Sequence, residues 1–196
     1  MWSSSRSRTP SGGVRAAVLA AGLALCAAAA ADTQRAVPSY LPKYLEQPRA
    51  AGHGRLTWYG FHVYDARLLV PANFDARDPW AAPFALELTY ARSLKGSAIA
   101  ERSDDEMEKL GAGSAAQRAT WLDAMKRVFP DVRAGTRITG VYLGERGARF
   151  YVDGALAGAI EDEAFARAFF AIWLDPRTSA PALRTALLSG AAPARP

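Results

Sequence analysis

Between Gly54 and Pro71 the chain reads GRLTWYGFHVYDARLLVP, a long strand-like segment within its 196 residues. Apolar side chains fall on both alternating faces, which is typical of a strand that is covered on both sides or lines a cavity. Gly60 interrupts the segment, and we expect a bulge or kink there that re-aims the residues after it. The pattern therefore predicts a strand from Gly54, with Ala66–Val70 as its continuation or as a second strand. The segment is either the floor of a ligand pocket or an ordinary central strand.

Arg55, near the start of this segment, is its most informative charge. A guanidinium offers a rigid pair of N–H donors to a carboxylate or an enolate-like oxygen. Together with Tyr64 and Tyr90, it could hold the acid head of an apolar ligand. The other interpretation is a surface arginine, in solvent or paired with Asp65 or Glu87, and the residue pattern alone favours that one.

The segments that follow predict the fold class. The strands come in clusters separated by pairs of helices, which favours an antiparallel sheet and the α+β class. Alternating residues predict a strand over Phe84–Ala91, and Asp153-Gly154 is a two-residue hairpin signal. The other expected elements are helices over Leu94–Leu110, capped by Ser93, and Ser114–Phe129, strands over Arg137–Leu143, Ala148–Val152 and Ala155–Ile160, and helices over Asp162–Trp173 and from Ser179 onward.

The first 31 residues have the pattern of a secretory signal. Residues 1–15 carry three arginines and no acid, and residues 16–31 are uncharged. This apolar run is shorter than the roughly 20 residues that cross a membrane, and it ends in small residues at Ala31. We therefore expect cleavage after Ala31, a periplasmic or secreted protein, and no stable membrane insertion after cleavage.

The same cleavage changes what the composition implies. Cys26 is the only cysteine and lies before the cut, so the mature chain has no disulfide. Leu25 is too large for the residue that precedes a lipidated cysteine, which argues against a lipoprotein. Without the basic leader the charge is nearly balanced and no long basic run is left, which argues against nucleic acid as a partner.

The mature chain divides into three parts. Residues 32–51 contain Pro38, Pro42 and Pro48 and predict an extended arm. Residues 52–190 form the expected single domain, and residues 191–196 are a tail that we expect to be disordered.

Motifs for metal or covalent chemistry are missing. His53 and His62 are the only histidines, and the sequence has no Gly-x-Ser-x-Gly. The glycine-rich Gly111–Ser114 joins two helices and lacks the lysine of a phosphate loop. The acidic residues of Asp104–Glu108 point around a helix, which favours a solvated face over a calcium site. We expect no metal and no cofactor.

Several segments resemble, in their order, those of the chalcone isomerase-like family. Gly54-Arg55 is followed nine residues later by Tyr64, and the late segment Thr136–Gly158 also fits the family pattern. The C-terminal Phe169–Pro176 and Ser179–Leu188 resemble its ending. The resemblance covers about residues 52–190.

The resemblance implies an antiparallel sheet with helices layered on one face, an open-faced β-sandwich, and a ligand cleft between the two layers. The plant enzymes of this family close the third ring of a flavanone by adding a phenolate oxygen across an enone. Relatives bind fatty acids without known catalysis. In both, an arginine matching Arg55 meets the anionic part of the ligand.

The match at other site positions is uneven. Tyr64 stands where the plant enzymes have a threonine that helps to polarise the ketone, and Thr178 or Ser179 matches a hydroxyl residue of the C-terminal loop. Their helix tyrosine and asparagine fall near Ile99 and Glu106, so both are replaced. Because such groups position and polarise the substrate, their loss argues against flavonoid isomerase activity.

The leading hypothesis is an exported, non-catalytic protein that binds a small apolar carboxylate such as a fatty acid. The carboxylate would lie on Arg55 with Tyr64 or Tyr90, near Thr178 and Ser179. The apolar wall would come from Trp58, Phe61, Leu86, Leu88, Trp121 and Met125. The alternatives are an intramolecular lyase acting on a chalcone-like or other enone, and a structural or protein-interaction module. Nothing in the sequence indicates a particular protein partner.

Overall fold

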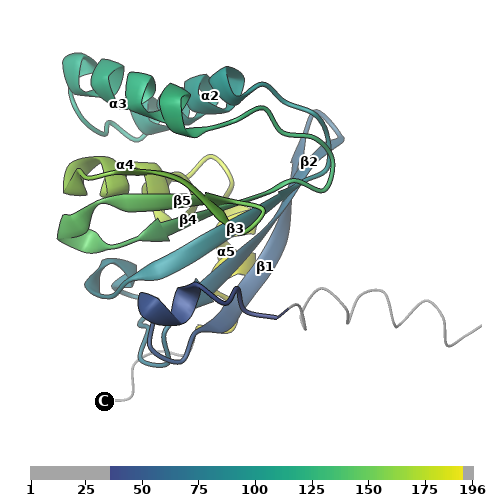
Figure 1. The fold of residues 1–196 in the computed structure, drawn as a ribbon, viewed down its shortest axis with the longest axis vertical. Helices are drawn as coiled ribbons and strands as arrows, with labels where there is room; N and C mark the ends of the chain where they lie inside the picture. Colours follow the sequence, from purple (N-terminus) through teal and green to yellow (C-terminus); the bar gives the residue numbers. More distant parts are fainter. Residues whose placement is uncertain (1–35, 192–196) are drawn as a thin grey trace, which may run out of the picture. The chain divides into compact units, whose positions relative to one another are not determined.

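The computed structural model describes residues 36–191. The predicted signal over residues 1–31, the start of the predicted arm and residues 192–196 of the predicted tail lie outside the described residues. Within them, six antiparallel strands form one sheet in sequence order, with the helices layered against one face (Figure 1). This arrangement confirms the predicted antiparallel α+β fold.

The strands agree with the sequence pattern in the second half of the chain and differ in the first. The predicted bounds of the last two strands are those observed, and Asp153 and Gly154 form the predicted turn with positive φ at both residues. The strands are β1 (Arg49–Trp58), β2 (Phe61–Val70), β3 (Phe84–Tyr90), β4 (Arg137–Tyr142), β5 (Ala148–Val152) and β6 (Ala155–Ile160).

The predicted bulge or kink at Gly60 is instead the turn of a β-hairpin, so the second strand begins at Phe61 and not at Ala66. Trp58 pairs with Phe61, and the two residues between them are both left-handed, with φ of 47° at Tyr59 and 79° at Gly60. Two-residue hairpin turns often need positive φ at both positions, and glycine adopts it without steric cost. The register of the ladder shifts at two other places, at Ala51 on β1 and at Val63 on β2.

Four α-helices occur in the described residues: α2 (Gly96–Lys109), α3 (Ala115–Val128), α4 (Glu163–Leu174) and α5 (Pro181–Leu188). The helix α3 begins as predicted. The Ser114 side chain accepts a hydrogen bond from the Gln117 backbone, and the Gln117 side chain accepts one from the Ser114 backbone. The cap predicted at Ser93 is wrong. Lys95 is the N-cap of α2, and the Asp131 side chain accepts the hydrogen bond from the Gly96 backbone at 3.0 Å.

The main core lies between the sheet and the helices. Leu86 and Leu88 of β3 point into it and are buried, as are Trp121 and Met125 of α3. The helix α5 packs directly on β1, and a Cβ added to Gly52 would overlap the carbonyl of Ala186. A glycine is needed there because the helix and strand backbones approach so closely.

The opposite face of the sheet is covered in part by the segment before β1. Its short 3₁₀ helix η1 (Leu41–Lys43) buries Leu41, which packs with Leu45, Leu69 and Val141 in a second, smaller core. Beside it lies a buried ion pair, in which Arg67 donates to Glu87 at 3.1 Å. Two covered faces explain why β2 is apolar on both sides.

Candidate functional site

Two buried tyrosines lie side by side on the helix-facing side of the sheet. Tyr64 of β2 pairs with Tyr90 of β3, and their rings meet edge to face at 5.9 Å. The indole N–H of Trp173 donates to the Tyr64 hydroxyl at 2.9 Å, whereas no residue between 36 and 191 hydrogen-bonds to the Tyr90 hydroxyl. Burial raises the pKa of both phenols, so both stay neutral and able to donate an O–H.

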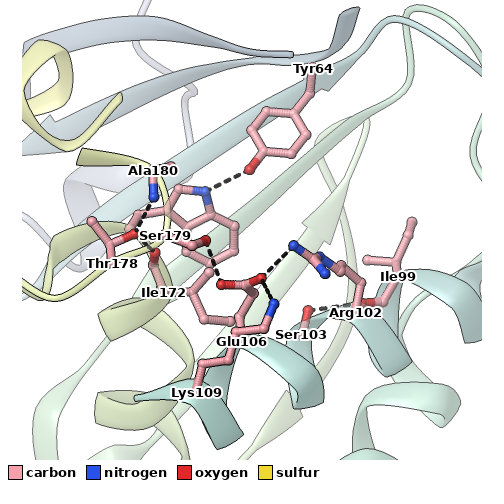
Figure 2. A network of polar contacts seen from close by, with 11 residues as sticks. Tyr64, Ile99, Arg102, Ser103, Glu106, Lys109, Ile172, Thr178, Ser179 and Ala180 are labelled. Carbon is pink, nitrogen blue, oxygen red and sulfur yellow. Dashed lines mark hydrogen bonds and ion pairs between the residues drawn. The ribbon is translucent and has the colours of Figure 1, made fainter. Parts of the chain in front are cut away.

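Glu106 of α2 is the centre of a polar cluster, drawn below Tyr64 in Figure 2. The residue is 6% exposed, and its carboxylate accepts hydrogen bonds from Ser179 Oγ at 2.6 Å and Lys109 Nζ at 2.9 Å. Burial raises the pKa of Glu106, but the hydrogen bonds from Ser179 and Lys109 and the charges of Arg102 and Lys109 outweigh it. The pKa is lowered overall, so Glu106 is ionised at neutral pH.

Arg102 connects this cluster to the end of the β1–β2 hairpin. One turn before Glu106 on the same helix face, it forms an ion pair with that carboxylate at 2.5 Å. Its guanidinium carbon lies 4.3 Å from the centre of the Trp58 ring. The side chain is 42% exposed, so part of the guanidinium is open to another anion. The charges of Glu106 and Arg102 also act on the Tyr64 hydroxyl.

Two cations therefore form ion pairs with one buried carboxylate. Arg102 and Lys109 carry two positive charges, and Glu106 carries one negative charge. The cluster keeps a net positive charge near the Tyr64 hydroxyl, on which the charges of Glu106 and Arg102 act, while the Ser179 hydroxyl already donates its hydrogen to Glu106. Such an arrangement can hold a small anion, because guanidinium and hydroxyl donors both hydrogen-bond to carboxylates.

The structure does not bring Arg55 and Tyr64 into one site, so the shared site expected from the sequence is wrong. Arg55 pairs with Asp65 across the β1–β2 ladder and donates to it at 2.9 Å. Successive strand residues point to opposite faces, so Asp65 and Arg55 lie on the face away from the helices. His62 lies 3.2 Å from the same carboxylate, and the Arg55 side chain is 60% exposed.

The other predicted site residues divide between the cluster, the core and the surface. Ser179 reaches Glu106, whereas Thr178 holds its own loop by donating to the Ile172 carbonyl at 2.5 Å. The predicted wall residues Leu86, Leu88, Trp121 and Met125 are buried on the helix side. Trp58 and Phe61 are exposed at the hairpin end instead.

Sequence reasoning assigned Glu106 to a solvated helix face and did not select Arg102 or Trp173. The i, i+4 spacing of Arg102 and Glu106 was a usable signal, since it places both side chains on one face of a helix. Nothing in the local pattern indicated that this face would pack against the Ser179 loop.

The described residues contain neither a metal-ligand cluster nor a helix that could span a membrane. No group of three or more His, Cys, Asp or Glu within 36–191 is arranged to hold a metal ion. None of the helices in this part of the chain has the length and apolar character needed to cross a membrane.

Comparisons with known proteins agree with the fold. No curated protein matches the sequence. The structure is similar to the crystal structure of a fatty-acid binding protein of Arabidopsis thaliana, with a TM-score of 0.58 and 12% sequence identity. That match covers 74% of this chain and 88% of the plant chain, and at this identity it shows a common fold. The family model described as chalcone isomerase-like matches residues 51–189. The chain therefore belongs to the chalcone isomerase-like family.

Proposed function

We propose that the protein binds a small apolar carboxylate, such as a fatty acid, and does not catalyse a reaction on it. The carboxylate lies on the open side of the Arg102 guanidinium, near Lys109 and the Ser179 hydroxyl. The apolar part lies against the helix-facing side of β3. The observation that carries this proposal is the surplus positive charge of the Glu106 cluster, in which two cations with partly exposed side chains pair with one carboxylate.

The choice of ligand class follows from the surroundings of the cluster. Tyr64, on which the charges of Glu106 and Arg102 act, pairs with Tyr90 of β3, and both tyrosines are buried in the main core together with Leu88. An anion with an apolar body can pair its head with the cations and shield its body from water, and both contacts favour binding. The structurally similar plant protein is a fatty-acid binding protein, which makes fatty acids the first ligands to test.

Glu106 argues for binding rather than isomerase chemistry. By resemblance it falls near the asparagine of the plant enzymes, whose amide can donate a hydrogen bond. An ionised carboxylate is only an acceptor, and its negative charge opposes the enolate oxygen that develops during ring closure. Tyr64 keeps a raised pKa because it is buried, so it can donate a hydrogen bond but does not act as a phenolate base at neutral pH.

Export is a separate part of the proposal and rests on residues 1–31 alone. We propose that these residues direct the chain out of the cytoplasm and are removed after Ala31. The mass of the intact protein recovered from the periplasm or medium tests this. A mass that corresponds to a chain starting at Asp32 supports it, and an unprocessed chain in the cytoplasm contradicts it.

Calorimetric titration with palmitate and with methyl palmitate tests the binding proposal. We expect the acid to bind and Arg102→Gln to weaken its binding by at least about tenfold, the effect of losing one charge-assisted hydrogen bond. Binding of the ester, which has no negative charge, should be weakened much less by this substitution. No uptake of palmitate by the native protein, or equal losses for acid and ester, would contradict the proposal. Turnover of naringenin chalcone above background would contradict the absence of catalysis.

A further inference from the structure

Exposed aromatic side chains gather at one end of the molecule. Trp58, Tyr59 and Phe61 are 48%, 86% and 64% exposed. All three lie within four residues around the β1–β2 turn. In the described residues, Leu156 of β6 is the other large apolar side chain that is exposed. We refer to residues 58–61 as the hairpin tip.

The hairpin tip extends beyond the rest of the sheet. Pairing of β2 with β3 starts at Tyr64, and the Val63 carbonyl accepts one more hydrogen bond from Ala91. The hairpin tip lies beyond both of these contacts. Figure 1 shows this end of the hairpin at the upper right, near the connection that leads into α2. An aromatic turn in this position can contact an external surface without any change in the fold.

Arginines surround the hairpin tip. The guanidinium carbon of Arg92, which follows β3 and is exposed, lies 5.6 Å from the Phe61 ring centre. Arg102 lies in the same way over Trp58 at 4.3 Å. Arg55 is three residues before Trp58 on β1, and its side chain points toward solvent and Asp65. The surface around the aromatic side chains is therefore rich in guanidinium groups.

An anionic lipid surface matches this combination. Indole and phenol rings prefer the boundary between lipid head groups and acyl chains, where an apolar ring and a polar edge are both accommodated. Guanidinium groups bind phosphate oxygens through paired N–H donors, and an anionic membrane surface attracts them. A water-soluble surface gains nothing from three neighbouring exposed aromatics, which mark interaction sites.

We propose that the hairpin tip docks on an anionic lipid bilayer. Its aromatic side chains enter the head-group region, and Arg92 and Arg55 contact lipid phosphates. The contact is reversible, because a single anchor of this size gives marginal membrane affinity. This inference goes beyond the proposed carboxylate binding and does not depend on it, since it applies to the protein with or without a ligand. The Trp58–Arg102 contact would place the lipid surface next to the Glu106 cluster.

Sedimentation with vesicles tests the docking. Vesicles of phosphatidylcholine alone are compared with vesicles containing one quarter phosphatidylglycerol. The tip variant carries Tyr59→Asn and Phe61→Thr; asparagine tolerates the left-handed turn position and threonine suits a strand. The matched control, Leu156→Ser, removes an exposed apolar side chain elsewhere. All chains have the same N-terminus, so residues 1–35 contribute equally.

We expect the native protein to bind the anionic vesicles more strongly than the neutral ones, and less strongly as salt is raised. The tip variant should lose about tenfold in partitioning, because two aromatic side chains no longer leave water. Leu156→Ser should partition like the native protein. Equal sedimentation of the tip variant and the native protein would overturn the proposal.

A second measurement reports on the tip itself. Lipids brominated on the acyl chain quench tryptophan residues that reach them, and Trp58→Phe removes one such reporter while keeping an aromatic ring. The fluorescence lost on adding brominated vesicles should be smaller in Trp58→Phe than in the native protein. An unchanged loss would show that Trp58 does not reach the lipid and would overturn the proposal. A tip variant that changes only the oligomeric state in light scattering would instead identify a surface for a second copy of the chain.

Discussion

Two buried carboxylates on opposite faces of the same sheet have different surroundings. Glu87, under the N-terminal segment, forms a buried ion pair with Arg67 at 3.1 Å. Glu106, on the helix side, accepts from Arg102, Lys109 and Ser179, and the two cations leave the cluster with surplus positive charge. The first pair is buried on both sides, whereas the second reaches solvent through Arg102 and Lys109.

The difference separates a structural ion pair from a candidate binding site. A fully enclosed pair offers an external anion neither access nor unused charge. A cluster with more cations than carboxylates and a half-open guanidinium offers both. Three carboxylates in different surroundings, Glu87, Glu106 and Asp65, allow this distinction to be tested by substitution with the matching amide.

The largest loss of stability is expected for Glu87→Gln. The substitution leaves the Arg67 guanidinium buried without a full negative charge, and breaking a buried pair in this way costs about 3 kcal/mol or more. Urea denaturation of the variant measures the loss. Palmitate binding by the folded variant should be unchanged, because the pair lies on the other face. A stability equal to that of the native protein would show that the pair is not a structural one.

A smaller loss, about 1–2 kcal/mol at neutral pH, is expected for Glu106→Gln, because its surroundings are partly open to water. The variant should bind palmitate more tightly than the native protein, since the internal competitor for Arg102 and Lys109 has lost its charge. Weaker binding would indicate that Glu106 positions Arg102 rather than competing with the ligand.

The same substitution should change how stability depends on pH. Hydrogen bonds and neighbouring cations hold the pKa of Glu106 below its ordinary value. The carboxylate therefore contributes stability above its unfolded pKa of about 4.3, and this contribution is lost as pH falls through the folded pKa. Glu106→Gln should show a shallower decline in urea stability below that pH. An identical decline in both proteins would contradict the ionised state of Glu106.

The smallest effect is expected for Asp65→Asn. Its partner Arg55 is mostly exposed, and exposed ion pairs contribute less than about 1 kcal/mol. The unfolding midpoint in urea should stay close to that of the native protein. A loss as large as that for Glu87→Gln would mean that the two faces do not differ as described.

The sequence was sufficient for the antiparallel sheet, the later strands and most helices, because alternation and helical spacing are local signals. It was misleading at the hairpin. Tyr59 occupies a left-handed turn position that bulky residues rarely adopt, so Tyr59-Gly60 lacked the usual signal of a two-residue turn. Missing this turn affected the expected site, because strand residues alternate between the two faces of a sheet. A shift of one residue moves each following side chain to the opposite face.

The candidate site could be predicted only in part. The family resemblance drew attention to Tyr64, Ser179 and the position of Glu106; Ser179 donates to Glu106 in the structure, and the Tyr64 hydroxyl accepts from Trp173. Their role in binding stays a prediction. The cation could not be inferred in the same way. Neither the neighbours of Arg55, Gly54 and Leu56, nor those of Arg102, Glu101 and Ser103, indicate which arginine lies at a site. Only the folded arrangement distinguishes an exposed strand residue from a helix residue that pairs with Glu106.

Titration of palmitate into Arg55→Gln and Arg102→Gln, side by side with the native protein, tests the central claim most directly. Each variant loses one guanidinium. Arg55 lies on β1, on the face away from the helices, and Arg102 lies on α2, on the helix side of the sheet. We predict at least about a tenfold loss of affinity for Arg102→Gln and less than about a twofold loss for Arg55→Gln. A large loss for Arg55→Gln, with Arg102→Gln binding like the native protein, would contradict the assignment of the site to the helix-facing side.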